Sequence, residues 1–138
     1  MTDKIYLDAN FIVASLIYDH PFHNHAVQKN EDLLNANLFT SFLVIDEIVY
    51  SLTKYNLPKE SIKNLLTDHL LLIENLSLIR EPTEIQSLNE YLKDWISFNL
   101  KPRDAMHHFL MKIEGIRNMA TFDSDFIKNA DKLGIKIV

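Results

Sequence analysis

Short apolar runs alternate along this chain with longer segments whose apolar residues recur at helical spacing. The first run, Ile5-Tyr6-Leu7, is followed at once by a helical pattern. Strands separated by helices form parallel sheets, because a parallel pair needs a long crossover connection. We therefore expect a three-layer α/β/α fold with a mainly parallel central sheet flanked by helices. The predicted strands are 5–7, 38–40, 78–79, 119–122 and 135–138, and the predicted helices are 10–18, 22–35, 42–55, 59–75, 83–98, 103–114 and 123–129.

Local signals mark some of the helix ends. The tetrapeptide Thr83-Glu84-Ile85-Gln86 has the spacing of a capping box, which predicts a helix start. Gly115 is expected to end the helix before it. No repeat, low-complexity tract or glycine-rich linker divides the 138 residues, so we expect a single domain over residues 1–138.

Composition removes several classes of protein. Without cysteine the chain has no disulfide framework, no thiolate zinc site and no cysteine nucleophile. Residues 1–4 lack the basic start and long apolar stretch of a signal peptide, and no apolar run is long enough to span a bilayer, so we expect a cytoplasmic protein that does not bind membranes. The net charge of -5, from 14 basic and 19 acidic residues, argues against a uniformly basic nucleic-acid coat but allows a local basic patch.

Four acidic residues lie where the predicted elements meet. Asp8 and Asp123 each follow a predicted strand, at the carboxyl edge where open α/β sheets build their sites. Asp104 comes just after Pro102 at a predicted helix start, and Glu47 lies within a predicted helix. Carboxylates brought together repel one another unless they bind a cation or take up protons. The pattern therefore favours a divalent metal site.

Each of these acids also has a purely structural interpretation. Asp123 is a good helix N-cap, and Asp104 in a first helical turn is favoured by the helix dipole. Glu47 only borders the apolar stripe of its helix, so periodicity permits but does not select it. Asp8 is the strongest functional candidate, because an acid directly after a buried strand needs partners to offset its desolvation.

Several motifs in order carry a resemblance to a known family. They are Leu7-Asp8-Ala9-Asn10, Thr40-Ser41 followed by Glu47, Pro102-Arg103-Asp104-Ala105, and Thr121-Phe122-Asp123-Ser124-Asp125-Phe126. The whole chain resembles a PIN domain, and its size resembles the stand-alone, VapC-like ribonuclease toxins of prokaryotic toxin–antitoxin pairs. The resemblance implies catalytic roles for Asp8, Glu47, Asp104 and Asp123, a fifth acidic position at Asp125, and supporting polar groups at Asn10, Ser41 and Thr121.

The chemistry that the resemblance implies is metal-dependent hydrolysis of RNA phosphodiester bonds, leaving 5′-phosphate ends. Mg²⁺ or Mn²⁺ suits a set of carboxylate ligands, because hard cations prefer oxygen. We expect Asp8, Asp104 and Asp123 to contact the metal and Asp125 to complete its ligand shell. Glu47 is expected to act as a ligand or to orient the attacking water.

Basic and imidazole side chains near the motifs have two interpretations. Lys101 and Arg103 are candidates to bind substrate phosphates, although a solvated rim of exposed ion pairs explains them equally. Asp104, His107 and His108 share one helical face, which is compatible with a zinc site, but packing beneath the acidic site is the favoured interpretation. The same holds for the histidines at 20, 23 and 25, which lie in a segment that is not catalytic in the family.

Other functions remain open at this point. A phosphatase of the haloacid dehalogenase type also begins with an aspartate after a strand, but it needs a second acid where this chain has Asn10. A catalytically silent PIN-fold module that binds RNA or protein, and an RNA-processing nuclease that is not a toxin, are further alternatives. A toxin implies a small antitoxin partner. A homodimer is also expected, since the segment 42–75 is rich in apolar positions, among them Leu57, Ile62, Leu65, Leu66 and Leu70.

Overall fold

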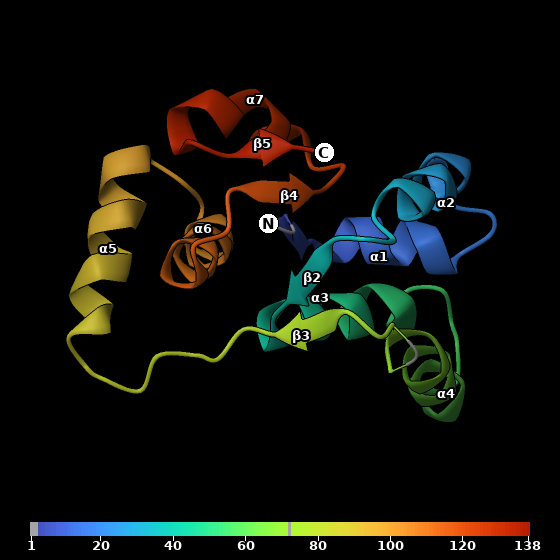
Figure 1. The fold of residues 1–138 in the computed structure, drawn as a ribbon. Coiled ribbons are helices and arrows are strands. Elements are labelled where there is room, and N and C mark those ends of the chain that lie inside the picture. The colour runs from blue at the N-terminus through green and yellow to red at the C-terminus, as the bar shows by residue number, and fades with distance from the viewer. Residues whose placement is uncertain (1–2, 72) are drawn as a thin grey trace.

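A five-stranded sheet in the order β3-β2-β1-β4-β5 forms the centre of the computed structural model, which describes residues 3–71 and 73–138 (Figure 1). All four strand pairings are parallel, and Tyr6 at the centre pairs with Phe39 on one side and Met119 on the other. The strands are β1 (Lys4–Leu7), β2 (Asn37–Thr40), β3 (Leu76–Leu78), β4 (Asn118–Ala120) and β5 (Lys136–Ile137).

Seven helices flank this sheet in the described residues, which confirms the predicted three-layer α/β/α fold. The helices are α1 (Ala9–Leu16), α2 (His23–Asp32), α3 (Phe42–Thr53), α4 (Lys59–Leu70), α5 (Ser87–Phe98), α6 (Pro102–Glu114) and α7 (Ser124–Leu133). None of them is long and apolar enough to cross a bilayer.

The central strand β1 is buried along almost its whole length, as expected for a parallel sheet covered on both faces. Tyr6, Val44, Ile48 and Met119 are fully inaccessible to solvent and form the middle of the core. Of the apolar residues proposed for a dimer face, Ile62 is buried and the other four pack partly against this core. Packing within the chain therefore accounts for much of their apolar surface.

Two predicted boundaries in the middle of the chain are wrong. The helix predicted over 59–75 ends at Leu70, and the strand predicted at 78–79 is β3. A turn follows Leu70, in which the amide of Ile73 binds the carbonyl of Leu70, and Asn75 then accepts a bond from Leu38 of β2. The end of the predicted helix therefore pairs with β2 instead, although its apolar residues recur at helical spacing. Residue 72, within the predicted helix, lies outside the described residues.

The predicted capping box does not start a helix. Helix α5 begins at Ser87, and no side chain caps it. The amides of Ser87 and Leu88 instead bind the carbonyls of Glu84 and Ile85, so the tetrapeptide forms a turn. Gly115 ends α6 as predicted, in the left-handed conformation that favours glycine.

Two further boundaries lie near the predicted site. Strand β4 ends at Ala120 rather than residue 122, and α7 continues to Leu133 rather than 129, where Gly134 ends it. Because the sheet is parallel, the starts of α1, α3 and α7 all lie at the carboxyl ends of the strands. This edge therefore collects the polar side chains that follow the strands.

Candidate metal-binding site

A small pocket of about 140 Å³ lies at the carboxyl edge of the sheet. All four predicted acidic residues line it, although they come from parts of the chain up to 115 positions apart, from Asp8 to Asp123. The remaining lining residues include two polar side chains that bear on its chemistry, Asn10 and His107. The full lining is Asp8, Ala9, Asn10, Glu47, Ser51, Asp104, His107, Asp123 and Phe126.

Asp8 is fixed by the turn from β1 into α1. It is the N-cap of α1, and its Oδ1 accepts a bond of 2.8 Å from the amide of Ala9. Its Oδ2 accepts a second bond of 2.8 Å from the hydroxyl of Thr121. Only 4% of Asp8 is exposed, and this burial raises the pKa of its carboxyl group despite the nearby His107. Asp8 is therefore an anchored carboxylate that is costly to ionise.

The two residues after β4 connect Asp8 to Asp123. The hydroxyl oxygen of Thr121 also accepts a bond of 3.0 Å from the amide of Asp123. The amide of Phe122 donates to Oδ1 of Asn10 at 3.0 Å, which ties the same turn to α1. Asp123 caps α7 by accepting from the amide of Asp125 at 2.8 Å. The structural interpretation of Asp123 as an N-cap is thus confirmed, and the residue lines the pocket as well.

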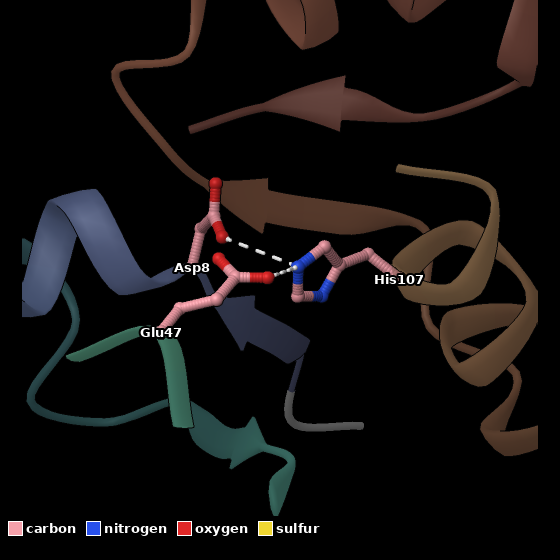
Figure 2. Close-up of side chains that lie close together, drawn as sticks. All are labelled: Asp8, Glu47 and His107. Carbon is pink, nitrogen blue, oxygen red and sulfur yellow. Dashed lines mark hydrogen bonds and ion pairs between the residues drawn. The ribbon is translucent and has the colours of Figure 1, made fainter. Parts of the chain in front are cut away.

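Glu47 reaches the pocket from α3 and meets His107 from α6 (Figure 2). Nε2 of His107 lies 2.7 Å from Oε1 of Glu47 and 3.9 Å from Oδ1 of Asp8. Burial alone lowers the pKa of His107, but the bond to Glu47 and the neighbouring carboxylates outweigh it and raise the pKa. Asp8, Glu47 and His107 each have one atom of a type that binds metals, and these three atoms lie within 4.8 Å of one another.

A chain of hydroxyl groups holds the other side of His107. The hydroxyl of Tyr6 lies 2.7 Å from Nδ1 of His107 and 2.8 Å from Oγ of Ser41. Oγ of Ser41 also accepts a bond from the amide of Val44 and so caps α3. Burial raises the pKa of Tyr6, so its hydroxyl keeps its proton. The network is satisfied when Ser41 donates to Tyr6 and Tyr6 donates to Nδ1 of His107.

That arrangement assigns a role to His107. With Nδ1 accepting from Tyr6, the hydrogen of the neutral ring sits on Nε2 and points to the carboxylate of Glu47. Protonation of the ring leaves this Nε2–H in place. Nε2 therefore donates to Glu47 and has no lone pair for a metal. His107 was missed as a site residue, although its spacing of three from Asp104 put it on the same helical face.

Asp104 lies in the first turn of α6, which begins at Pro102. Burial and then the charge of Asp123 raise the pKa of Asp104 to about 6, with smaller contributions from Asp125 and Asp8. Asp8 and Asp104 are thus both hard to ionise without a counter-charge. Carboxylate oxygens that converge on one pocket and carry raised pKa values fit a hard divalent cation such as Mg²⁺ or Mn²⁺.

The histidine-based zinc arrangement is not formed by the described residues. Nε2 of His108 binds the carbonyl of Leu133 at 3.0 Å, and Nδ1 faces Asp94 at 3.3 Å, so this ring is turned away from Asp104. His23 binds the carbonyl of Ala14, and His20 accepts a bond from its own loop. His108 and His23 thus make hydrogen bonds within the fold, as the structural interpretation has it.

The predicted outer residues lie at the rim. Asp125 does not line the pocket; its Oδ2 pairs with Nζ of Lys101 at 3.4 Å, and its charge reaches Asp104. The side chain of Lys101 is 78% exposed, so this pair is screened by solvent. Arg103 is exposed on the first turn of α6 and makes no ion pair within residues 3–71 and 73–138.

Comparisons with known proteins identify the family and the fold. A family model described as the PIN domain matches residues 5–132. Among solved structures, VapC20 from Mycobacterium tuberculosis, described as a sarcin-ricin loop cleaving toxin, has a TM-score of 0.65 at 21% identity, over 90% of this chain and 93% of that chain. The comparison with curated proteins found no match.

Two further solved structures are similar to this chain. VapBC2 from Rickettsia felis, bound to a DNA fragment from its promoter, has a TM-score of 0.68 at 17% identity, over 97% of this chain and 98% of that chain. FitAcB from Neisseria gonorrhoeae has a TM-score of 0.62 at 19% identity, over 96% of this chain and 95% of that chain. At these identities the likeness establishes the fold.

Proposed function

This chain belongs to the PIN domain family, and we propose that it is a metal-dependent endoribonuclease that hydrolyses RNA phosphodiester bonds. The observation that carries the proposal is the convergence of Asp8, Glu47, Asp104 and Asp123 on one pocket. Burial and mutual repulsion raise the pKa of Asp8 and of Asp104, so the metal-free arrangement is electrostatically unfavourable at neutral pH. A divalent cation offsets this cost.

Asp8, Asp104 and Asp123 are the residues that would hold Mg²⁺ or Mn²⁺. Asp8 is the best anchored of them, since both of its oxygens accept hydrogen bonds from the protein. Asp125 has an outer role in this proposal, because it lies outside the pocket lining and pairs with Lys101. The cation supplies Lewis acidity, which makes water a better nucleophile and stabilises negative charge on the phosphate.

Glu47 orients the attacking water in this scheme. Its Oε1 accepts from Nε2 of His107, and its Oε2 takes no bond within the described residues, which leaves that oxygen as an acceptor for water. His107 is a positioning residue, since it acts through Glu47. Three polar residues support the site. Asn10 fixes the turn before α7, and Thr121 holds Asp8. Ser41 binds Tyr6, which in turn holds the ring of His107.

Arg103 is the better of the two proposed phosphate-binding residues. Its exposed guanidinium on the first turn of α6 lies one residue before Asp104 and can donate two parallel hydrogen bonds to a phosphate. Lys101 is held by Asp125 at 3.4 Å, so it contributes charge at the rim and can bind a phosphate only in competition with that carboxylate.

A toxin role is the specific form of the proposal. The neighbour from Mycobacterium tuberculosis is described as a sarcin-ricin loop cleaving toxin, and another neighbour is VapBC2 bound to a DNA fragment from its promoter. These support an RNA substrate and a small antitoxin partner for this chain. We include a homodimer in the proposal. Growth arrest on expression, relieved by a neighbouring small gene, would test the toxin role; its absence in an active nuclease would favour RNA processing.

The direct test of the activity is a time course of the purified protein on labelled RNAs with Mg²⁺ or Mn²⁺. Cleavage that stops with EDTA and with Asp8→Asn, and that leaves 5′-phosphate ends, is the expected result. The exposed Asp68→Asn is the matched control, because it removes the same charge outside the pocket. Tight RNA binding by the wild-type protein without turnover would favour a catalytically silent module.

A further inference from the structure

Three phenylalanine rings form a continuous stack that runs from the core to the surface. Phe11 of α1 is buried, and its ring lies 5.7 Å from that of Phe122 at an interplanar angle of 29°. The ring of Phe22 lies 4.8 Å from Phe122 on a nearly parallel plane, at 14°. Phe22 remains 45% exposed. The outermost member of the stack thus presents aromatic surface to solvent.

The middle ring of the stack belongs to a turn that also contributes to the acidic pocket. Phe122 immediately precedes Asp123, and its amide donates to Oδ1 of Asn10. Asn10 and Asp123 both line the pocket. The same hydrogen-bonded turn therefore positions a pocket carboxylate and the middle ring of the stack.

The exposed ring is held in place before any ligand arrives. Its own amide donates to Nδ1 of His20 at 3.1 Å, within the segment between α1 and α2. Nδ1 of His23 binds the carbonyl of Ala14 at 2.8 Å and so ties the start of α2 to α1. The ring of His25 lies 5.9 Å from Phe122 and adds a second flat group at the surface. An ordered ring costs little further entropy on binding.

Charge alone gives this chain little affinity for a polyanion. Its net charge is -5, and no lysine or arginine is among the described residues that line the pocket. Of the two predicted basic residues near the pocket, Lys101 is paired with Asp125, which leaves only Arg103 to bind phosphate without competition. Stacking of bases on aromatic rings provides affinity that does not depend on positive charge, and only unpaired bases can reach such a ring.

We propose that the exposed face of Phe22 stacks one unpaired base of the RNA whose phosphodiester bond lies at the acidic pocket. This inference rests on the proposed nuclease function and adds to it a base-binding position at Phe22. Paired bases in a regular helix are excluded, because their faces are covered by their neighbours in the stack.

Stacking can be measured separately from cleavage. Short single-stranded RNAs, each with the fluorescent base 2-aminopurine at one position, are titrated with the full chain in Ca²⁺, and a gel of the same samples checks that the RNA stays intact. Wild type and Phe22→Tyr should bind and quench the fluorescence at one position. Phe22→Ala and Phe22→Leu should bind about tenfold more weakly and lose the quenching. Phe22→Leu is the matched variant, since it keeps apolar bulk without a ring.

The outcomes separate this inference from the function on which it rests. Folded Phe22→Ala and Phe22→Leu proteins that bind and quench as wild type would overturn the stacking proposal, as would a wild-type protein that quenches at no position. Trp95 lies on α5, outside the pocket lining. A Trp95→Ala protein that loses as much RNA binding and quenching as Phe22→Ala would also overturn the stacking proposal. A wild-type protein that quenches but never cleaves in Mg²⁺ or Mn²⁺ would instead contradict the nuclease proposal and leave the stacking site standing.

Discussion

Nε2 of His107 donates to Oε1 of Glu47 across 2.7 Å and joins α6 to α3 at the mouth of the acidic pocket. Glu47 belongs to a helix that otherwise presents apolar side chains to the core, and it would be free to turn toward solvent without this bond. The position of His107 is itself determined by the hydroxyl of Tyr6 on the central strand. The geometry of Glu47 is therefore set by the centre of the sheet.

Removing the imidazole should disturb Glu47 more than it disturbs metal binding. His107→Ala leaves Glu47 without its partner and the buried Tyr6 hydroxyl with Ser41 alone, so we expect kcat to fall by about 10- to 100-fold with little change in KM. It should also lower the free energy of unfolding by about 1–3 kcal/mol. Steady-state cleavage and urea unfolding measure the two effects. A folded variant with unchanged kcat would contradict the positioning role.

Tyr6→Phe is the companion variant, because it removes only the hydroxyl that holds Nδ1 of His107. We expect a smaller loss of kcat than in His107→Ala and a loss of about 1 kcal/mol in the free energy of unfolding. If His107 acts through Glu47, then Tyr6→Phe should have no further effect on kcat in a Glu47→Gln background, and a double-mutant cycle measures this.

The metal-free protein should become less stable as the pH rises from about 4 to about 7. The folded pKa of Asp104 is raised to about 6, and that of Asp8 is also raised, so the folded state binds these protons more tightly than the unfolded state. The stability they contribute is present at low pH and is lost as the pH passes the folded values. Thermal melts in EDTA across this range measure the slope.

Asp104→Asn should flatten that slope and raise the melting temperature of the metal-free protein at pH 7, since it removes a carboxylate that burial and Asp123 make costly to ionise. Asp68→Asn, at an exposed position of α4, serves as the control and should leave the slope unchanged. Saturating Mn²⁺ should stabilise the wild type at pH 7 and not Asp104→Asn to the same extent. A steeper slope in Asp104→Asn would contradict the electrostatic account.

Thr121→Val keeps the shape of the side chain but removes the hydroxyl that binds both Asp8 and the amide of Asp123. We expect a loss of about 1–3 kcal/mol in the free energy of unfolding, because two buried polar groups lose their partner. Cleavage should fall as well, since Asp8 is then anchored on one side only. Thr67→Val, at an exposed position of α4, is the control and should change stability by less than about 0.5 kcal/mol.

Arg103→Ala should raise KM several-fold with kcat nearly unchanged, as expected for a side chain that binds phosphate equally in the ground and transition states. Arg117→Ala is the control, because Arg117 precedes β4 and lies at the opposite end of the strands. Kinetics at two salt concentrations measure the effect. Equal changes in KM for both variants would indicate general electrostatics and not a contact at the site.

The parts of the site that depend on local patterns were predictable from the sequence. Asp8 was expected at the carboxyl end of a buried strand, and it follows β1 there. Asp123 was expected directly after a strand, but β4 ends at Ala120, because Thr121 and the amide of Phe122 bond to Asp8 and Asn10 and not to a neighbouring strand. Side-chain bonds of this kind leave no trace in hydrophobic periodicity.

The role of His107 depends on contacts that no local pattern contains. Its partner Glu47 lies 60 residues away, and its other partner, Tyr6, lies 101 residues away. The helical face shared with Asp104 was visible in the sequence, but the role of Nε2 as a donor follows only from its contact with the Glu47 carboxylate, which can only accept. The failed capping box at residues 83–86 has a similar cause, since turn and helix start share the same residues there.

The central claim, that the acidic pocket holds a divalent cation, is tested most directly by calorimetric titration of Mn²⁺ into the metal-free protein at pH 7. Wild type and Asp68→Asn should bind with the same affinity and release protons, because the raised pKa of Asp104 leaves its carboxyl partly protonated without metal. Asp8→Asn should bind at least tenfold more weakly. Equal Mn²⁺ affinity in wild type and a folded Asp8→Asn protein would contradict the account.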